Sequence, residues 1–221
     1  MSQRFSAKKM NESISLREFR ESDRPALEQI IRETWNYDRF CSPQTAKKMA
    51  KVYLNSCLAD QTYTQVAIAQ NSPVGVIMAK NATTHRCSLH LRLIQLLSVF
   101  SLLSTGEGRS AFRLLWNVEQ IDRELLDQCG PYDGELAFFA VQKDWRGLGI
   151  GKALFQSVVK YMRSQGISAF YLFTDTSCNY EFYERQGMKR RVSKEHLMKM
   201  RSHIERFVFF LYDYQIETTP V

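Results

Sequence analysis

The feature that most constrains this chain is a glycine-rich turn that follows an apolar run (residues 135–141) and opens an amphipathic run (residues 149–165). Three glycines within five positions, Gly147, Gly149 and Gly151, omit side chains where the backbone must approach something closely. The run after them places the unpaired N–H groups of a helix start at the same point, where the helix dipole favours an anion. The pattern therefore predicts a strand, a turn and a helix around a phosphate site, with a pyrophosphate as the usual occupant.

The glycine spacing excludes two common phosphate motifs. A dinucleotide fingerprint requires its third glycine five positions after its first, and the chain has Lys152 and Leu154 at the two positions concerned. A P-loop ending in Gly151 and Lys152 requires a glycine where the chain has Arg146, and Ser or Thr where it has Ala153. The remaining pattern is Arg-x-x-Gly-x-Gly, which begins at Arg146.

A second motif follows the next apolar run of the chain. It consists of Phe182 and Tyr183, with a glycine four residues after the tyrosine. Together the two motifs resemble the acyl-coenzyme A pyrophosphate loop and the Phe-Tyr-x-x-x-Gly-Phe signature of the GNAT superfamily of N-acyltransferases. The resemblance is strong over residues 135–188, weak before them and absent from residues 81–134. The chain departs from the usual form in having Asn179 only four residues before Tyr183.

This resemblance implies an α/β fold with a mixed, splayed central sheet flanked by helices, formed by residues 1–221 as one domain. It implies acetyl-coenzyme A as the acyl donor and co-substrate, with its pantetheine arm between diverging strands at residues 135–141 and 168–174. Neither the resemblance nor the residue pattern indicates a metal. The residues expected to contact the cofactor are Phe139, Val141, Arg146, Gly147, Leu148, Gly149, Ile150, Gly151, Lys152, Asn179 and Tyr183.

Two side chains are candidates for the chemistry that the resemblance implies. Tyr183 is the candidate acid, because a phenol can hydrogen-bond to a leaving thiolate and supply it with a proton. Glu135 opens the first splayed strand and is the candidate base for the ammonium proton. Each has a structural alternative, since Tyr183 fits an aromatic core position and Glu135 fits a solvated carboxylate at a strand end. A backbone N–H of the splayed strand is expected to hold the oxyanion.

Hydrophobic periodicity gives the order of the remaining elements. The predicted order is strand 13–19, helix 22–35, helix 42–58, strands 62–69 and 74–80, helices 89–103 and 111–125, strand 135–141, helix 149–165, strand 168–174, helix 178–186 and strand 207–214. Residues 190–204 fit either a helix or an irregular connection. The two helices after residue 81 predict a helical hairpin insertion at about residues 82–133. The first of these helices, residues 89–103, is apolar on more than one side, so we expect other parts of the protein to cover more than one of its sides. The hairpin could roof a substrate pocket, pair two subunits as a homodimer or only extend the core.

Composition narrows the class of partner. The net charge of +7 attracts anions, which fits coenzyme A as well as nucleic acid, and the absence of a recognised nucleic-acid module favours the cofactor. No apolar stretch is long enough to span a membrane or to act as a signal peptide, so we expect no membrane partner and a cytoplasmic location. The five cysteines are scattered, which predicts reduced thiols.

We therefore expect an acetyl-coenzyme A-dependent N-acetyltransferase that acts on a primary amine of a small molecule. Two alternatives stay open. One is a module that binds acyl-coenzyme A without turnover. The other is an acetyltransferase of protein, peptide or RNA-linked amines, which the basic charge favours slightly.

Overall fold

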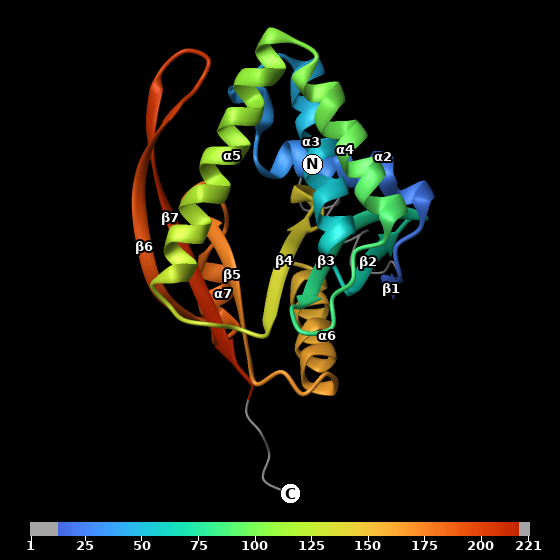
Figure 1. Ribbon diagram of the computed structural model, residues 1–221. Helices are drawn as coiled ribbons and strands as arrows, with labels where there is room; N and C mark the ends of the chain where they lie inside the picture. Colours follow the sequence, from blue (N-terminus) through green and yellow to red (C-terminus); the bar gives the residue numbers. More distant parts are fainter. Residues whose placement is uncertain (1–12, 217–221) are drawn as a thin grey trace, which may run out of the picture.

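The computed structural model describes residues 13–216, which form a seven-stranded mixed sheet with helices on both faces (Figure 1). The strand order is β1-β2-β3-β4-β5-β7-β6, and every neighbouring pair is antiparallel except β4 and β5. The strands are β1 (Ser15–Arg17), β2 (Tyr63–Ala69), β3 (Ser72–Asn81), β4 (Gly134–Val141), β5 (Ala169–Asp175), β6 (Lys189–Lys199) and β7 (Ile204–Gln215). The helices are η1 (Glu21–Asp23), α2 (Arg24–Thr34), η2 (Tyr37–Arg39), α3 (Pro43–Asp60), α4 (Leu89–Leu103), α5 (Gly106–Asp127), η3 (Lys143–Trp145), α6 (Ile150–Ser164) and α7 (Glu181–Arg185).

The two faces of the sheet have separate cores. On one face α6 packs through Leu154, Phe155 and Val158 against a cluster that α7 and β7 complete. On the other face α2 and α3 pack on β3 and β4, and α5 packs on β5, β6 and β7. The predicted fold class, a mixed α/β sheet flanked by helices, is confirmed.

The predicted splay lies between β4 and β5. These strands are paired only at Gly134 with Phe170 and at Glu135 with Tyr171, near the start of each strand. Beyond that point β5 stays paired with β7 along its whole length, while β4 stays paired with β3. The two central strands therefore separate toward their carboxyl ends, as Figure 1 shows for the yellow and orange strands.

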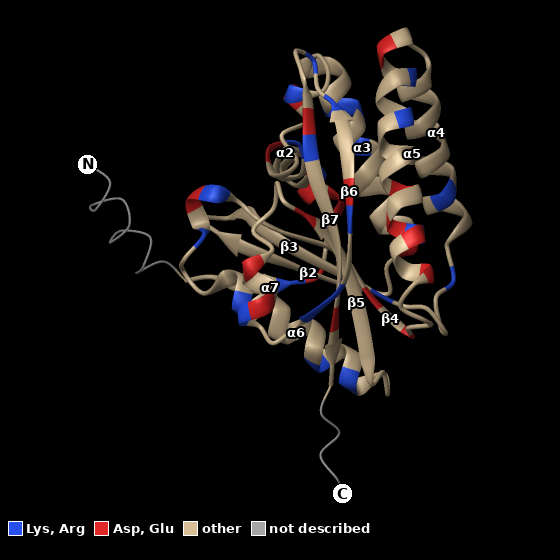
Figure 2. Cartoon of the chain, turned by 90° about the vertical axis from the view of Figure 1, so that its left-hand side faces the viewer, with Lys and Arg blue, Asp and Glu red and all other residues tan. Residues whose placement is uncertain are grey.

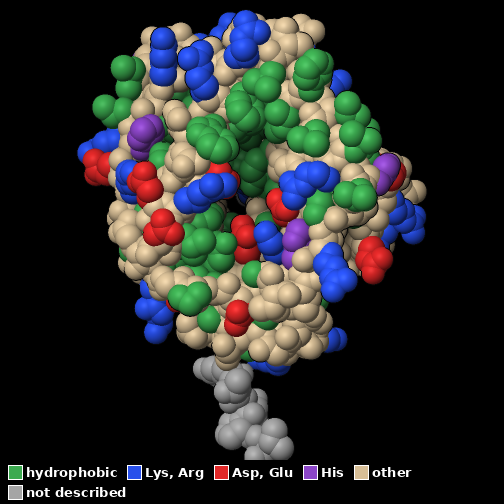
Figure 3. Space-filling view, viewed as in Figure 1, with side chains coloured by type: hydrophobic (Ala, Val, Ile, Leu, Met, Phe, Trp, Pro, Cys, Tyr) green, Lys and Arg blue, Asp and Glu red, His purple; other side chains and the backbone are tan. Residues whose placement is uncertain are grey.

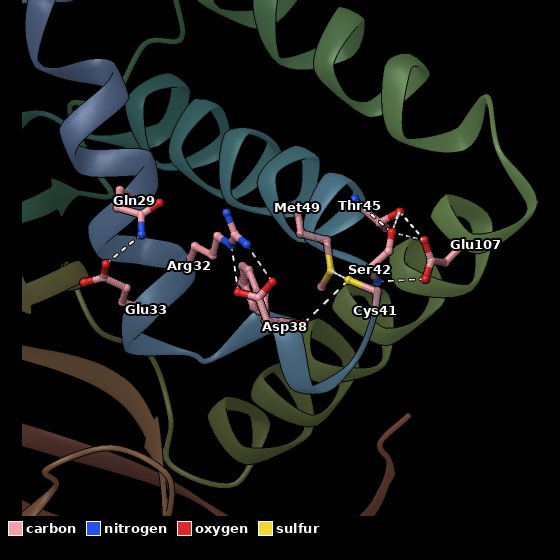
Figure 4. Close-up of polar contacts among 10 residues, drawn as sticks. Gln29, Arg32, Glu33, Asp38, Cys41, Ser42, Thr45, Met49 and Glu107 are labelled. Atoms are coloured by element: carbon pink, nitrogen blue, oxygen red, sulfur yellow. Dashed lines mark hydrogen bonds and ion pairs between the residues drawn. The ribbon is translucent and has the colours of Figure 1, made fainter. Parts of the chain in front are cut away.

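Two helices, α4 and α5, lie between β3 and β4, where the sequence predicts a helical hairpin. An acidic side chain, Glu107 in the first turn of α5, is one of the residues that tie this hairpin to α3. Its carboxylate accepts hydrogen bonds from the backbone N–H and hydroxyl of Ser42 and from the hydroxyl of Thr45 (Figure 4). These bonds hold the pKa of Glu107 at about 2. Glu107 is exposed, and it links the start of α5 to the start of α3.

The outer face of α4 is exposed, although the sequence predicts that this helix is buried on more than one side. Within the described residues Leu89, Leu93, Leu96, Leu97 and Phe100 are exposed. The inner side of the helix packs on α3 through Leu102 and Val99. No helix in the described part of the chain is long and apolar enough to cross a membrane. The homodimer, like the treatment of residues 1–221 as one domain, stays a prediction.

The interpretation of residues 190–204 as helix or irregular connection is wrong. Most of this stretch is β6, which pairs with β7 from Lys189 to Lys199. Its exposed and half-buried positions alternate in the structure, but the many basic residues give the sequence no clear alternation of apolar and polar residues. The pairing with β7 decides the conformation because each backbone group of the strand needs a partner.

Many of the basic residues near the C-terminus are engaged within the molecule. The pairs are Arg190 with Glu184, Arg191 with Asp213, Lys194 with Glu124, and Arg206 with Glu195. Figure 2 shows basic and acidic residues interspersed along the strands and helices. The positive charge of this region is therefore largely matched by neighbouring carboxylates, which weakens the case for an extended nucleic-acid surface.

Candidate active site

The glycine-rich turn has the geometry that the sequence predicts. Gly147 and Gly149 both have positive φ, of 80° and 81°, and Gly149 is the N-cap of α6. A Cβ atom at either position would meet no atom within 4 Å, so the space beside the turn is open. Glycine is needed here for the left-handed backbone, which disfavours other residues. The turn therefore presents the first N–H groups of α6 to open space, as an anion site requires.

Neighbouring residues hold the turn in place. Arg146 donates from Nε to the carbonyl oxygen of Val141 at 2.9 Å, which ties the turn to the end of β4. Trp145 and Ile150, on either side of the turn, are buried in the core. Lys152 is exposed in the first turn of α6, and Leu148 is half-buried against the core. The predicted loop residues thus lie together, and the guanidinium of Arg146 serves first to shape the loop.

A β-bulge in β4 sets the directions of the side chains at the splay. In the pairing with β3, Met78 lies opposite Phe138 and the next residue, Ala79, lies opposite Leu136. Ala137 is therefore the extra residue of β4, with no residue of β3 opposite it. A bulge changes which face the following residues point to. As a result Glu135 and Ala137 line a cavity on the α3 and α5 face, while Phe139 packs in the core on the α6 and α7 face.

Aromatic rings from β4 and α7 meet beside the glycine turn. The ring centroids of Phe139 and Phe182 are 5.2 Å apart, and those of Phe139 and Tyr183 are 6.1 Å apart. A Cβ atom on Gly151 would lie 3.3 Å from the Phe182 ring, so α6 approaches this cluster closely. Tyr183 is buried, and burial raises its pKa well above the usual value. Tyr183 and the glycine turn therefore lie on one face of the splayed sheet.

The other face of the splay holds a cavity of about 1130 Å³. Its floor is formed by β4 and β5, and its walls come from α2, α3, α4, α5 and the β6–β7 hairpin. Figure 3 shows the molecule hollowed near the centre of this face, where apolar, acidic and basic side chains meet. The aromatic side chains that line the cavity include Trp35, Tyr53, Phe112, Phe173, Phe207 and Phe209.

Glu135 lies on the floor of this cavity. Burial raises the pKa of its carboxyl group, although the ammonium of Lys80 and a hydrogen bond from the Tyr171 hydroxyl lower it in part. Tyr171 is the residue opposite Glu135 in the short β4–β5 pairing. A carboxylate with a raised pKa is a stronger base than a solvated one, so the position suits proton abstraction.

Asn179, the least regular match to the cofactor motif, lies just before α7. It is exposed, and its backbone carbonyl accepts the N–H of Phe182 at 3.1 Å. The preceding turn is fixed by Asp175, whose carboxylate accepts the N–H of Ser177 at 2.6 Å. Asn179 therefore follows the carboxyl end of β5, and within residues 13–216 its side chain forms no hydrogen bond with the glycine turn.

A sequence model described as the acetyltransferase (GNAT) family matches residues 24–188 of this chain. The chain belongs to this family. The match spans α2 to the end of the Tyr183 motif and includes the α4–α5 hairpin, which carries neither of the two motifs. No curated protein sequence matches the chain.

Solved structures share this GNAT fold at low sequence identity. One is PH1933 from Pyrococcus horikoshii OT3, with a TM-score of 0.59, 13% identity and coverage of 93% of this chain and 100% of that one. A second is NAA60 from Arabidopsis thaliana in complex with acetyl-CoA, with a TM-score of 0.55, 17% identity and coverage of 92% and 99%. A third is the ribosomal-protein-S18-alanine N-acetyltransferase from Escherichia coli, with a TM-score of 0.53, 12% identity and coverage of 94% and 97%. These likenesses concern the fold.

The sequence did not identify several side chains that line the cavity as candidate site residues. They are Lys80, Asp122, Tyr171 and Asp175. The sequence does mark Asp122 as unusual. It lies on the stripe of α5 that contains Val118 and Leu125, where an apolar residue is expected. No sequence pattern points to Tyr171, because its contact with Glu135 depends on the pairing of two strands that are distant in sequence.

Proposed function

We propose that this protein is an N-acetyltransferase that transfers an acetyl group from acetyl-CoA to the primary amine of a small molecule. The observation that carries the proposal is the arrangement of two half-sites across the splay. The glycine turn and Tyr183 lie on one face, and the cavity with Glu135 lies on the other. A gap between β4 and β5 separates them, which is the geometry for joining a donor on one side to an acceptor on the other.

The residues on the donor side fit acetyl-CoA. The open space beside Gly147 and Gly149 and the first N–H groups of α6 would hold the pyrophosphate. The edge of β4 past Glu135, which has no pairing with β5, would hydrogen-bond the pantetheine arm as an added strand does. NAA60, which shares the fold, carries acetyl-CoA in its crystal structure, in support of this assignment.

Acetyl-CoA supplies an activated acyl carbonyl and a thiol leaving group. Glu135 takes the proton that the acceptor ammonium must lose before its nitrogen can form the amide bond. Backbone N–H groups of β4 at the Ala137 bulge donate hydrogen bonds to the carbonyl oxygen as negative charge develops on it. Tyr183 holds its proton tightly, because burial raises its pKa, and so it stabilises the departing sulfur by donating a hydrogen bond.

The depth of the cavity, with lining residues on several sides, favours a small acceptor over a folded protein. Its lining comes from helices α2, α3, α4 and α5, the short helix η2 and strands β3, β6 and β7, which surround the floor. Its volume lies close to the upper end of the range for small-molecule sites. An unstructured peptide end remains the strongest rival among macromolecular acceptors. The E. coli relative of the same fold is named for a ribosomal-protein alanine, which keeps this rival worth testing.

Release of free thiol from acetyl-CoA, measured across small amines, polyamines, aminoglycosides and peptides, tests the proposal. We expect turnover with at least one class of small amine and a loss of about 100-fold or more in kcat for Tyr183→Phe. Phe182→Leu, which alters the adjacent ring but keeps the phenol, is the matched control and should retain more turnover. Binding of acetyl-CoA without thiol release from any amine would favour the non-catalytic module instead. Turnover with peptides alone would favour the protein acceptor.

A further inference from the structure

The charged residues around the cavity do not balance. Seven carboxylates and four basic side chains line it. Three of the basic residues are paired with lining carboxylates: Arg39 with Glu205, Arg92 with Asp60, and Arg123 with Glu119. Of the remaining carboxylates, Glu33 accepts a hydrogen bond from Gln29 at 2.6 Å. Three lining carboxylates, Asp122, Glu135 and Asp175, are then left without an assigned partner. The fourth basic residue of the lining, Lys80, is the one cation among the described lining residues that is left to match them.

Lys80 serves Glu135 and not the other two carboxylates. Its charge lowers the pKa of Glu135, and it stands opposite Glu135 in the β3–β4 register. Asp175 is held by the N–H of Ser177, which is a neutral donor. The side of the cavity that contains Asp122 and Asp175 therefore has negative charge without a matching cation in the described part of the chain.

Of the three carboxylates, Asp122 has the least favourable surroundings for a negative charge. Its side chain keeps some exposure because it lines the cavity, yet it lies deep among surrounding protein atoms. Among residues 13–216 no donor or cation bonds its carboxylate, and the charges that act on it are those of Glu119, Asp175 and Glu135, all acidic. An unpaired carboxylate in such a place costs free energy that a ligand cation would recover.

The surroundings indicate which kind of cation fits. No three His, Cys, Asp or Glu side chains in the described residues lie close enough to hold a metal ion. The lining of the same cavity includes aromatic side chains, with Phe112 from α5, Phe173 from β5, and Phe207 and Phe209 from β7. Aromatic faces attract organic ammonium groups and pack well against methylene chains. An organic ammonium on an aliphatic spacer matches this lining.

We propose that the acceptor carries a second cationic group, which Asp122 and Asp175 bind while Glu135 receives the reacting amine. The acceptor class is thus a diamine or polyamine. This inference rests on the proposed function and specifies the acceptor of that same site. Asp122 is a specificity-determining residue here, because it acts on the distal end of the acceptor and not on the reacting nitrogen.

Pairs of amines with the same number of heavy atoms test the second charge directly. The probes are 1,4-diaminobutane against 1-aminopentane and 1,5-diaminopentane against 1-aminohexane, with thiol release from acetyl-CoA as the readout. We expect kcat/KM for at least one diamine to exceed that of its monoamine by about tenfold or more, as a charge-assisted hydrogen bond provides. The ratio should fall about tenfold in Asp122→Asn and stay unchanged in Asp127→Asn, an exposed residue of the same helix outside the cavity lining.

The outcomes separate this inference from the proposed reaction. Equal use of diamines and monoamines, or a ratio that Asp122→Asn leaves unchanged, would overturn the second-charge site and leave the acetyltransferase intact. If no amine releases thiol, calorimetric titration with 1,4-diaminobutane decides. Binding that Asp122→Asn weakens would support the cation site while overturning the reaction, and no binding would overturn both.

Discussion

Glu135 and Phe139 lie four residues apart on the same strand, yet their side chains lie on opposite faces of the sheet. Regular alternation would place them on the same face. The extra residue at Ala137 breaks the alternation, so that one strand serves the acceptor cavity at its start and the donor side at its end. The bulge therefore permits β4 to contribute to both half-sites.

Replacement of Glu135 tests its role as the base. We expect Glu135→Gln to lower kcat/KM by about 100-fold or more, because the amide cannot accept the proton. Since burial raises the pKa of Glu135, the acid limb of the wild-type kcat/KM profile should lie above the ordinary glutamate value of 4.5 and should be lost in the variant. Glu195→Gln, an exposed change on β6, is the control. An unchanged acid limb in Glu135→Gln would assign the base elsewhere.

Two glycines at opposite ends of α6 separate backbone strain from cofactor binding. Gly149 and Gly166 have φ values of 81° and 72°, and neither Cβ position has a neighbour within 4 Å. Alanine at either site should cost about 1–2 kcal/mol of unfolding free energy through the left-handed backbone alone. Only Gly149→Ala should also weaken acetyl-CoA binding in calorimetry, because only Gly149 lies at the anion-binding end. Equal affinity in both variants would contradict the loop assignment, and Gly149→Glu should weaken binding further.

Asp122 should destabilise the empty protein at neutral pH. Its pKa is well above 3.8 in the folded state, mainly because of burial. Below pH 3.8 both states carry the proton, and as pH rises the unfolded state releases it first, so the wild type loses stability toward neutral pH. Asp122→Asn does not titrate. We expect its Tm to exceed that of the wild type by about 2–4 °C at pH 7 and to converge with it in acid. A lower Tm at pH 7 would show that Asp122 has a stabilising partner.

Glu107 should have the opposite pH dependence. Its folded pKa of about 2 lies below the usual 4.5, because the donors of Ser42 and Thr45 favour the carboxylate. Its contribution is present above pH 4.5 and is lost as pH falls toward 2. We expect Glu107→Gln to lower Tm by about 2–4 °C at neutral pH. The difference should shrink in acid, and a constant difference from pH 2 to pH 7 would contradict the electrostatic account. Glu124→Gln on the same helix is a control for loss of an exposed pair.

The sequence was sufficient where the signal is local. Glycines at fixed positions between a strand and a helix predicted the turn at Gly149, and the register of Phe182 and Tyr183 predicted the helix that follows β5. Residues 190–204 were misassigned because the pattern of β6 becomes visible only when it pairs with β7. The cover expected over α4 was inferred from apolarity alone, which does not state whether the chain itself supplies it.

The sequence by itself determined the order of strands and helices around the glycine turn, because spacing and side-chain-free positions act on the nearest few residues. The tertiary structure alone decided that Ala137 is a bulge and that Tyr171 reaches Glu135. It also decided that Asp122 lies among other carboxylates with no paired cation within residues 13–216. Each of these depends on strand register or on packing between elements far apart in the chain. The donor half-site was therefore predictable from its motifs, whereas the acceptor cavity arises from contacts that no single stretch of the sequence contains.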